Sequence, residues 1–166
     1  MARRERRWIA VGLGWAMAAA IAAACSNSTT PHQPAPCPSY SGGQSPGDSL
    51  FGVFQLESYC IDTLPAHGPP ADTGHVTLKR ATPVDSITAV FATRGQSPLN
   101  VAGTYTLSGT DSIHLSGQLA TPLGPTPVAL SGRFVLRHDT LSVSGRLTVT
   151  GAGERSLSFV GTRSAP

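Results

Sequence analysis

The chain has 166 residues, of which 40% are hydrophobic and 13% charged, and its formal net charge is +3. Four of the 12 Lys and Arg and one of the 9 Asp and Glu lie before residue 25, so the rest of the chain carries eight charges of each sign. This balance leaves no basic patch for nucleic acid or for an anionic membrane surface. We therefore expect no nucleic-acid partner.

Residues 1–24 have the pattern of an export signal. Four arginines in the first seven residues are followed by the stretch from Trp8 to Ala24, which contains no charged residue. This stretch is short and rich in alanine for a transmembrane helix. It therefore indicates a cleaved signal peptide and not a membrane span.

The end of this signal, Ala22-Ala23-Ala24-Cys25, resembles the bacterial lipobox. The resemblance implies that Cys25 carries a thioether-linked diacylglycerol and becomes the mature N-terminus, so that the partner is a membrane and the location the cell envelope. Ser26 matches the sorting rule known for some Gram-negative lipoproteins, which implies the outer membrane, facing the periplasm or the cell surface. The alternative is an ordinary secretory peptide cleaved after Ala24, which would leave Cys25 as a free thiol.

The next segment, residues 25–49, is dominated by Ser, Pro, Gly, Thr and Gln, and five prolines lie between positions 31 and 46. Such a composition cannot bury a core, so the sequence predicts a disordered tether. Gly43-Gln44-Ser45-Pro46-Gly47 matches the G-x-S-x-G pattern of serine hydrolases. No strand or helix pattern flanks it, as the catalytic turn requires, so we interpret it as a coincidence of composition.

Two further cysteines, Cys37 and Cys60, remain if Cys25 is lipidated. An even pair outside the cytoplasm is a candidate disulfide. The bond would tie the C-terminal part of the tether to the end of the first strand. The alternative is a free exposed Cys37 and a free buried Cys60.

From residue 50 onward, apolar and polar residues alternate in short runs, which is the period of a strand with one buried face. Threonine and serine fill many of the outward positions, and no stretch after the signal shows a helical period. The sequence therefore predicts an all-β domain over residues 50–166, with its strands between 52 and 163.

An internal repeat organises this domain. Residues 103–117 match residues 132–145, with one residue deleted at the turn. Each copy reads as a β-hairpin with a turn that ends in Asp111 or Asp139, and a third hairpin spans residues 146–163. Successive hairpins predict an antiparallel up-and-down meander, and closure into a barrel of about eight strands removes its exposed edges.

Three segments of the domain, residues 52–59, 103–107 and 157–160, resemble the bacterial lipocalin-like lipoprotein domains, whose first strand often reads Gly-x-Trp-x-Leu. The chain departs from this pattern at Phe54, which stands where Trp is usual, and in a proline-rich loop over residues 122–127. The resemblance implies a lipocalin-like barrel. It does not determine a ligand, because a fold does not fix a function.

The interior of an eight-stranded barrel is either filled by side chains or wide enough for one small ligand. The strand pattern directs five aromatic residues inward, and they form either an apolar pocket or, the interpretation we favour, the core: Phe54, Phe91, Tyr105, Phe134 and Phe159. The inward residues Ser58 and Ala89 leave room, whereas the recurring inward Leu and Val residues fill it.

We find no pattern of catalytic or metal-binding residues. The histidines are scattered and lack the local spacing to another ligand that is typical of metal sites. They are His32, His67, His75, His114 and His138. We therefore expect no enzyme activity, no metal and no cofactor.

The sequence favours a non-catalytic envelope lipoprotein that presents a small β-barrel in a structural or protein-interaction role, with another envelope protein as partner. The alternative is that the barrel binds or carries a small apolar ligand. An interior void of a few hundred Å³ would favour the alternative, and a packed interior the first role.

Overall fold

The computed structural model of the protein describes residues 35–63 and 65–164. Nine strands lie in these two ranges: β1 (Gly43–Gln44), β2 (Gly52–Ile61), β3 (Asp72–Lys79), β4 (Ser86–Thr93), β5 (Leu99–Ser108), β6 (Ser112–Thr121), β7 (Gly124–Arg137), β8 (Thr140–Val149) and β9 (Gly153–Arg163). Within the same ranges there is no helix long and apolar enough to cross a membrane. The expected signal peptide and Cys25 lie outside the described residues.

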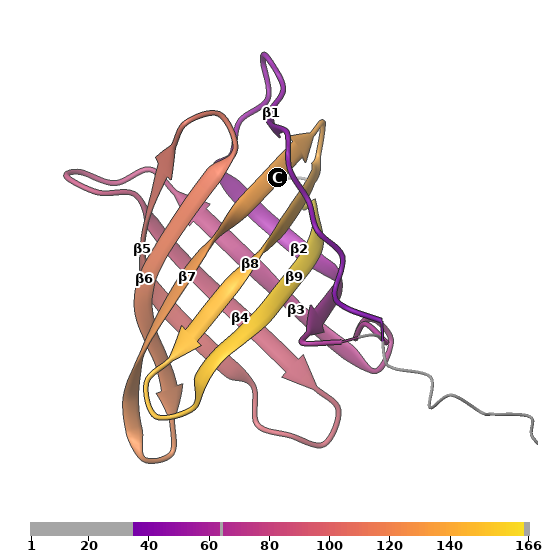
Figure 1. Ribbon diagram of the computed structural model, residues 1–166, viewed down its shortest axis with the longest axis vertical. Coiled ribbons are helices and arrows are strands. Elements are labelled where there is room, and N and C mark those ends of the chain that lie inside the picture. The colour runs from indigo at the N-terminus through magenta and orange to yellow at the C-terminus, as the bar shows by residue number, and fades with distance from the viewer. Residues whose placement is uncertain (1–34, 64, 165–166) are drawn as a thin grey trace, which may run out of the picture. The chain divides into compact units, whose positions relative to one another are not determined.

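Strands β2 to β9 form a closed barrel (Figure 1). Each strand pairs antiparallel with the next, and β2 pairs with β9 to close the ring. The short strand β1 is additional and pairs parallel with β7. The predicted all-β, up-and-down barrel of eight strands is therefore confirmed.

The sequence repeat corresponds to the β5–β6 and β7–β8 hairpins, and the glycines that bound each copy pair with each other. Gly103 lies opposite Gly117, and Gly132 opposite Gly145. A Cβ atom on Gly132 would lie 2.3 Å from the carbonyl oxygen of Ser144. The two strands approach too closely here for any side chain, so this glycine pair lets the sheet bend sharply around the barrel.

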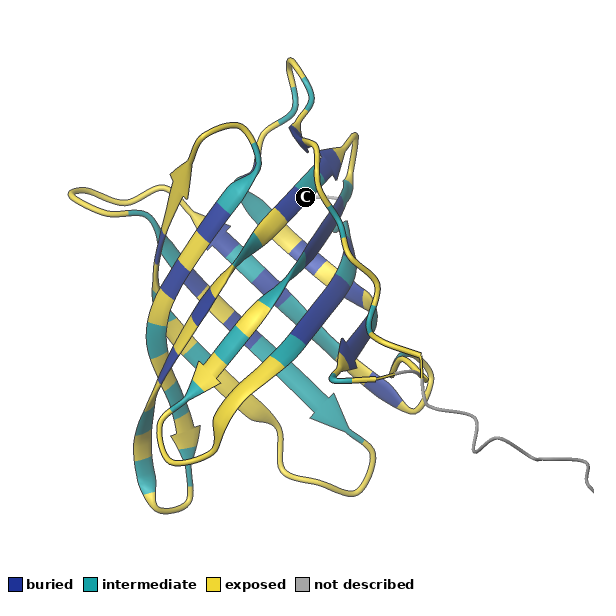
Figure 2. Cartoon of the chain, in the orientation of Figure 1, coloured by how far each residue is buried: buried dark blue, intermediate teal, exposed yellow. Residues whose placement is uncertain are grey.

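On β7 and β8 this glycine pair separates two halves of the interior. On one side of the pair, Phe134, Leu136, Leu141 and Val143 are buried in the core. Phe54, Tyr105 and Leu50, which precedes β2, belong to the same packed core. Figure 2 shows the resulting alternation of buried and exposed positions along the strands.

Two positions that the strand alternation assigns to the interior are not enclosed there. Leu107 has the same parity as the buried Tyr105, but it is 45% exposed, because the pairing between β4 and β5 ends at Thr104 and leaves the end of β5 without a neighbouring strand on one side. Ser58 was also expected to point inward. A β-bulge in β2 shifts the pairing with β9 between Leu56 and Ser58, so Tyr59 takes the inward position in its place.

Residues 35–49, which we call the strap, lie along the outside of the barrel (Figure 1). The structure joins Cys37 to Cys60 of β2 by a disulfide. The backbone of Tyr40 donates to Ser144 Oγ at 2.7 Å, and Arg137 donates to Ser45 Oγ at 2.9 Å. The predicted disorder is therefore wrong for residues 35–49, because hydrogen bonds and a disulfide hold this polar segment without a core. The rest of the predicted tether lies outside the described residues.

Within residues 34–166, the residues that the structure describes form one compact unit. This unit contains the nine strands, the disulfide and the hydrophobic core cluster. Because its stabilising interactions are internal, we expect a fragment of residues 34–166 to fold by itself, and it is the protein for the solution experiments below.

The hydroxyl of Tyr105 is buried and has no hydrogen-bond partner among the described residues. Burial, reinforced by the Asp85 carboxylate and opposed by Arg80, raises the pKa of Tyr105 to about 12. Because this folded-state pKa lies above the ordinary value of about 10, the unfolded chain loses the phenolic proton first, so the stability of the fold falls as the pH rises from 10 towards 12.

We expect Tyr105→Phe to raise the free energy of unfolding at pH 7 by about 1 kcal/mol, because it removes an unpaired buried polar group. The variant should also lose less stability than the wild type between pH 10 and 12. Urea melts across this range measure both effects. A variant less stable than the wild type at pH 7 would show that the hydroxyl has a partner.

Candidate ligand cavity

The other half of the barrel interior is hollow. It holds a cavity of about 340 Å³. The lining reaches Leu119 and Val149 near the ends of β6 and β8, and Gln96 in the β4–β5 loop. The cavity therefore approaches the end of the barrel where the β4–β5, β6–β7 and β8–β9 connections lie, at the bottom of Figure 1, and we call this end the mouth.

Most residues that line this half are aliphatic, and four of them, one alanine and three valines, are small enough to leave room for the cavity. Ala89 of β4 and Val101 of β5 are among them, and Ala89 leaves room as expected from the sequence. On β7 and β8, the positions beyond the glycine pair that line the cavity are Val128, Leu130, Leu147 and Val149. The wall is therefore a nearly continuous apolar surface.

The five aromatic residues expected inside the barrel divide between the two halves. Phe54, Tyr105, Phe134 and Phe159 are buried in the core. Phe91 is only partly buried and lines the cavity. Neither of the two interpretations of these residues, filled core or apolar pocket, describes the whole interior.

One sector of the wall is polar, and we call it the polar corner: Tyr59, His67, Thr93 and Gln96. The hydroxyls of Tyr59 and Thr93 are 2.9 Å apart. The ring of His67 stacks on that of Tyr59 with 5.1 Å between centroids, and its Nδ1 lies 3.1 Å from Oδ2 of the buried Asp72. The corner therefore combines a mostly apolar cavity with a few fixed hydrogen-bonding groups, which is typical of ligand sites.

Sequence reasoning missed this corner. The bulge in β2 turns Tyr59 inward, and His67 comes from the proline-rich connection between β2 and β3. The two residues meet through a backbone bridge, in which each amide donates to the carbonyl of the other. No spacing rule relates His67 to Asp72, five residues later in the chain, so the sequence carries no signal for this contact.

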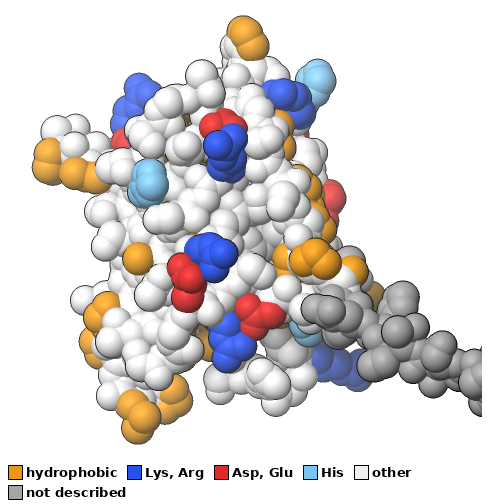
Figure 3. Space-filling model, in the orientation of Figure 1, with side chains coloured by type: hydrophobic (Ala, Val, Ile, Leu, Met, Phe, Trp, Pro, Cys, Tyr) orange, Lys and Arg blue, Asp and Glu red, His pale blue; other side chains and the backbone are white. Residues whose placement is uncertain are grey.

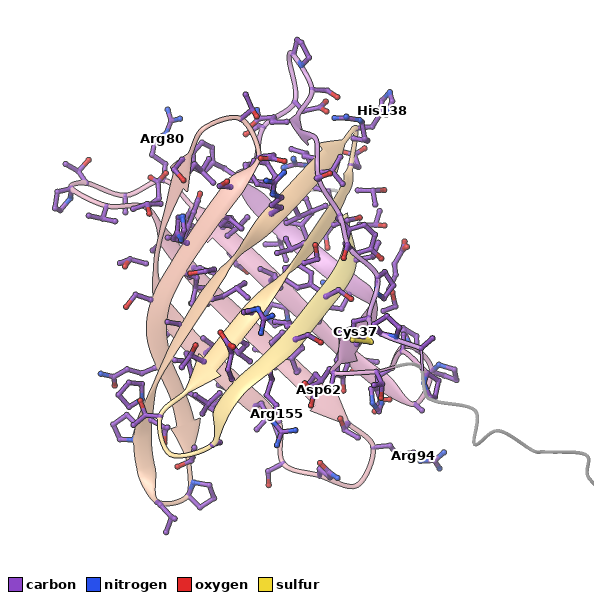
Figure 4. All side chains as sticks on the ribbon, in the orientation of Figure 1. Cys37, Asp62, Arg80, Arg94, His138 and Arg155 are labelled. Atoms are coloured by element: carbon purple, nitrogen blue, oxygen red, sulfur yellow. A yellow bond between two sulfur atoms is a disulfide. The ribbon has the colours of Figure 1, made fainter. Side chains whose placement is uncertain are left out.

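Two ion pairs lie near the mouth. Arg155 donates to Asp62 at 2.7 Å, and Arg146 donates to Glu154 at 2.9 Å. The hydrogen bond from Arg155, with a second from the backbone of Ser156, holds the pKa of Asp62 below its ordinary value against the opposing effect of burial. Figure 3 shows positive side chains beside negative ones on this face, and Figure 4 shows Asp62 and Arg155 together. The two charges of each pair largely cancel, so these pairs contribute little net electrostatic potential at the mouth.

A second hollow, of about 390 Å³, lies outside the barrel between the strap and strands β7 to β9. Tyr40, Arg133 and Ser144 line it, together with glycines and other serines. It is wide open to solvent and offers a small molecule few apolar contacts. We therefore take the interior cavity as the candidate site.

Residues 35–63 and 65–164 contain no group of three or more His, Cys, Asp or Glu side chains placed to hold a metal ion. The G-x-S-x-G copy lies in the strap, where Ser45 Oγ accepts a hydrogen bond from Arg137. On the exposed face of β6, Nδ1 of His114 lies 3.3 Å from Oγ of Ser131. His32 lies outside the described residues.

Comparison of the chain with protein-family models, with curated proteins and with solved structures finds no match in any of the three.

Proposed function

We propose that the barrel binds one small apolar molecule in its cavity. The observation that carries this proposal is an apolar void of about 340 Å³ reaching the mouth. Its volume is at the lower end of the usual range for ligand pockets, about 300–1,000 Å³. A water-sized group takes about 30 Å³ in a liquid, so the cavity has room for roughly a dozen carbon atoms.

The structural or interaction role, which we favoured from the sequence, gives no reason for this void. An unfilled apolar cavity lowers stability by about 24 cal/mol for each Å³. A barrel that served only as a scaffold would be more stable with larger inward residues in place of Ala89 and the valines. The closed meander with a cavity at one end also supports the proposal that the domain is lipocalin-like.

The proposal includes a lipid anchor at Cys25, at the cell envelope and on the outer membrane. Its support is the signal-like segment before Cys25, together with the place where the chain joins the barrel. Pro36 pairs with Thr63 beside the mouth, and Cys37 is bonded to Cys60. Pro36 is the eleventh residue after Cys25, and these residues are few. They span at most about 40 Å when extended, so an anchor would keep the mouth near a lipid source of apolar ligands.

We expect Ala89→Leu to weaken the binding of an apolar fluorescent dye to the 34–166 fragment at least about tenfold, because the added side chain fills the cavity. The free energy of unfolding should stay equal or rise, since the cavity shrinks. The matched control is Ala129→Leu, which adds the same bulk to an exposed position of β7 and should leave dye binding unchanged. Equal dye binding by both variants, or none by the wild type, would refute the cavity as a ligand site.

We expect Cys25→Ser to abolish lipid labelling in cells and to block removal of residues 1–24. The control is Cys37→Ser, which makes the same substitution at another cysteine and leaves the anchor position intact. Metabolic labelling with a radioactive fatty acid and mass spectrometry of the mature protein measure the outcome. Wild-type protein with an unmodified Cys25 in a soluble fraction contradicts the anchor.

A further inference from the structure

The polar corner lies on one side of an otherwise apolar cavity, so the site offers both an apolar surface and hydrogen-bonding groups to a ligand. We propose that its ligand is an uncharged amphiphile, with an apolar body in the cavity and a hydroxyl that donates a hydrogen bond to Nε2 of His67. This inference rests on the proposed function and names the ligand class of the same cavity.

His67 is held in place from three directions. Its backbone pairs with that of Tyr59 through two hydrogen bonds of 2.6 and 2.8 Å. Its ring stacks on Tyr59, and its Nδ1 faces the carboxylate of Asp72 at 3.1 Å. Asp72 is only 8% exposed, so the carboxylate is fixed behind the ring. A ring fixed in this way presents its other nitrogen in one direction, without losing conformational freedom on binding.

The Asp72 contact also sets which ring nitrogen carries the proton. A carboxylate accepts hydrogen bonds only, so in the neutral imidazole Nδ1 carries the hydrogen and Nε2 has the free lone pair. The His67 side chain is about half exposed (51%) and belongs to the cavity lining. The hydrogen bond of the ring among the described residues is made by Nδ1, so we take Nε2 as the free acceptor at the mouth, and its complement is a donor.

Charge selects against an anionic head at the corner, and the cost of desolvation selects against a cationic one. A carboxylate head has no hydrogen to donate to Nε2 and would lie near Asp72. Arg155 is engaged with Asp62, and Arg94 extends away from the barrel in Figure 4. An ammonium head can donate, and Asp72 would attract it, but it would have to give up water beside a mostly apolar wall. An alcohol donates a hydrogen bond to Nε2 and has neither the repulsion of an anion nor the desolvation cost of a cation.

The test is displacement of an apolar dye from the 34–166 fragment at pH 8. The probes are decan-1-ol, methyl nonyl ether, decanoate and decylamine, which have similar size and differ in the head. Decan-1-ol and the ether have the same number of heavy atoms, but only the alcohol donates. We expect the alcohol to bind about three- to tenfold tighter than the ether, which corresponds to one hydrogen bond, and tighter than either ion.

His67→Phe should remove the preference for the alcohol over the ether and leave the affinity for the ether within about twofold, because it keeps the stacked ring and deletes the acceptor. His114→Phe, the same change on the outer face of the barrel, should preserve the preference. If His67→Phe is too unstable to measure, Asp72→Asn replaces it. This change allows the ring to carry its proton on Nε2, so the ratio of the affinities for the alcohol and the ether should fall towards one.

The outcomes distinguish failure of the proposed function from failure of the proposed ligand class. Failure of every probe to displace the dye from the wild type, or failure of the dye to bind, refutes the proposed function. Equal affinity for alcohol and ether, an unchanged preference in His67→Phe and Asp72→Asn, or tighter binding of decanoate or decylamine overturns the uncharged head while the cavity stands.

Discussion

Phe134→Ala is expected to lower the free energy of unfolding by about 3–5 kcal/mol, through lost transfer free energy and the cavity left behind. Phe134 is 2% exposed and packs in the filled half of the barrel, beside Leu136 and Val143. Because its neighbours are held by strands on both sides, they cannot collapse into the space. Urea melts of the 34–166 fragment measure the loss.

The matched substitution is Phe91→Ala, which deletes the same side chain from the wall of the cavity. Phe91 is only partly buried and faces empty space on one side, so it has fewer contacts to lose. We expect a cost of about 1–2 kcal/mol, close to the transfer contribution alone, together with altered dye binding. Equal costs at the two positions would contradict the division of the interior into a packed and a hollow half.

Gly132→Ala should cost about 3 kcal/mol or more, although it adds only one methyl group. The new Cβ would lie 2.3 Å from the carbonyl oxygen of Ser144 and 2.9 Å from the Cα of Gly145. Both are backbone atoms of the paired strand, so neither can rotate out of the way. Relief requires the β7–β8 hairpin to straighten, which would disturb the packed core beside it.

Gly151→Ala is the control, because it makes the same substitution at a glycine where the added methyl group meets no neighbouring atom. Gly151 lies in the β8–β9 turn with a φ of 84°, and an added Cβ there would meet no atom within 4 Å. Its cost is backbone strain alone, about 1–2 kcal/mol. Thermal or urea unfolding of the two variants decides between the mechanisms. If Gly132→Ala is as stable as Gly151→Ala, the bend at the glycine pair does not depend on close backbone contact.

The strap is a segment whose composition led to a wrong prediction of disorder. Residues 35–49 lack the apolar side chains of a core, and from this we expected disorder. Arg137 and Ser144, which hold the strap, lie about a hundred residues away in the sequence, and β1 pairs with two residues of β7 beyond the end of β6. Composition reports what a segment can bury, and says nothing about backbone partners that a distant strand supplies.

The sequence by itself determined the strand class, the hairpins and the closed meander, because alternation of side chains and turn residues are local properties of the chain. It also placed Phe54, Tyr105, Phe134 and Phe159 inside the barrel. Only the tertiary structure decided which part of the interior is empty, since a void depends on which residues of several strands meet at one level. The polar corner was decided there too, because the bulge that turns Tyr59 inward and the loop that carries His67 to it are set by pairing between distant segments.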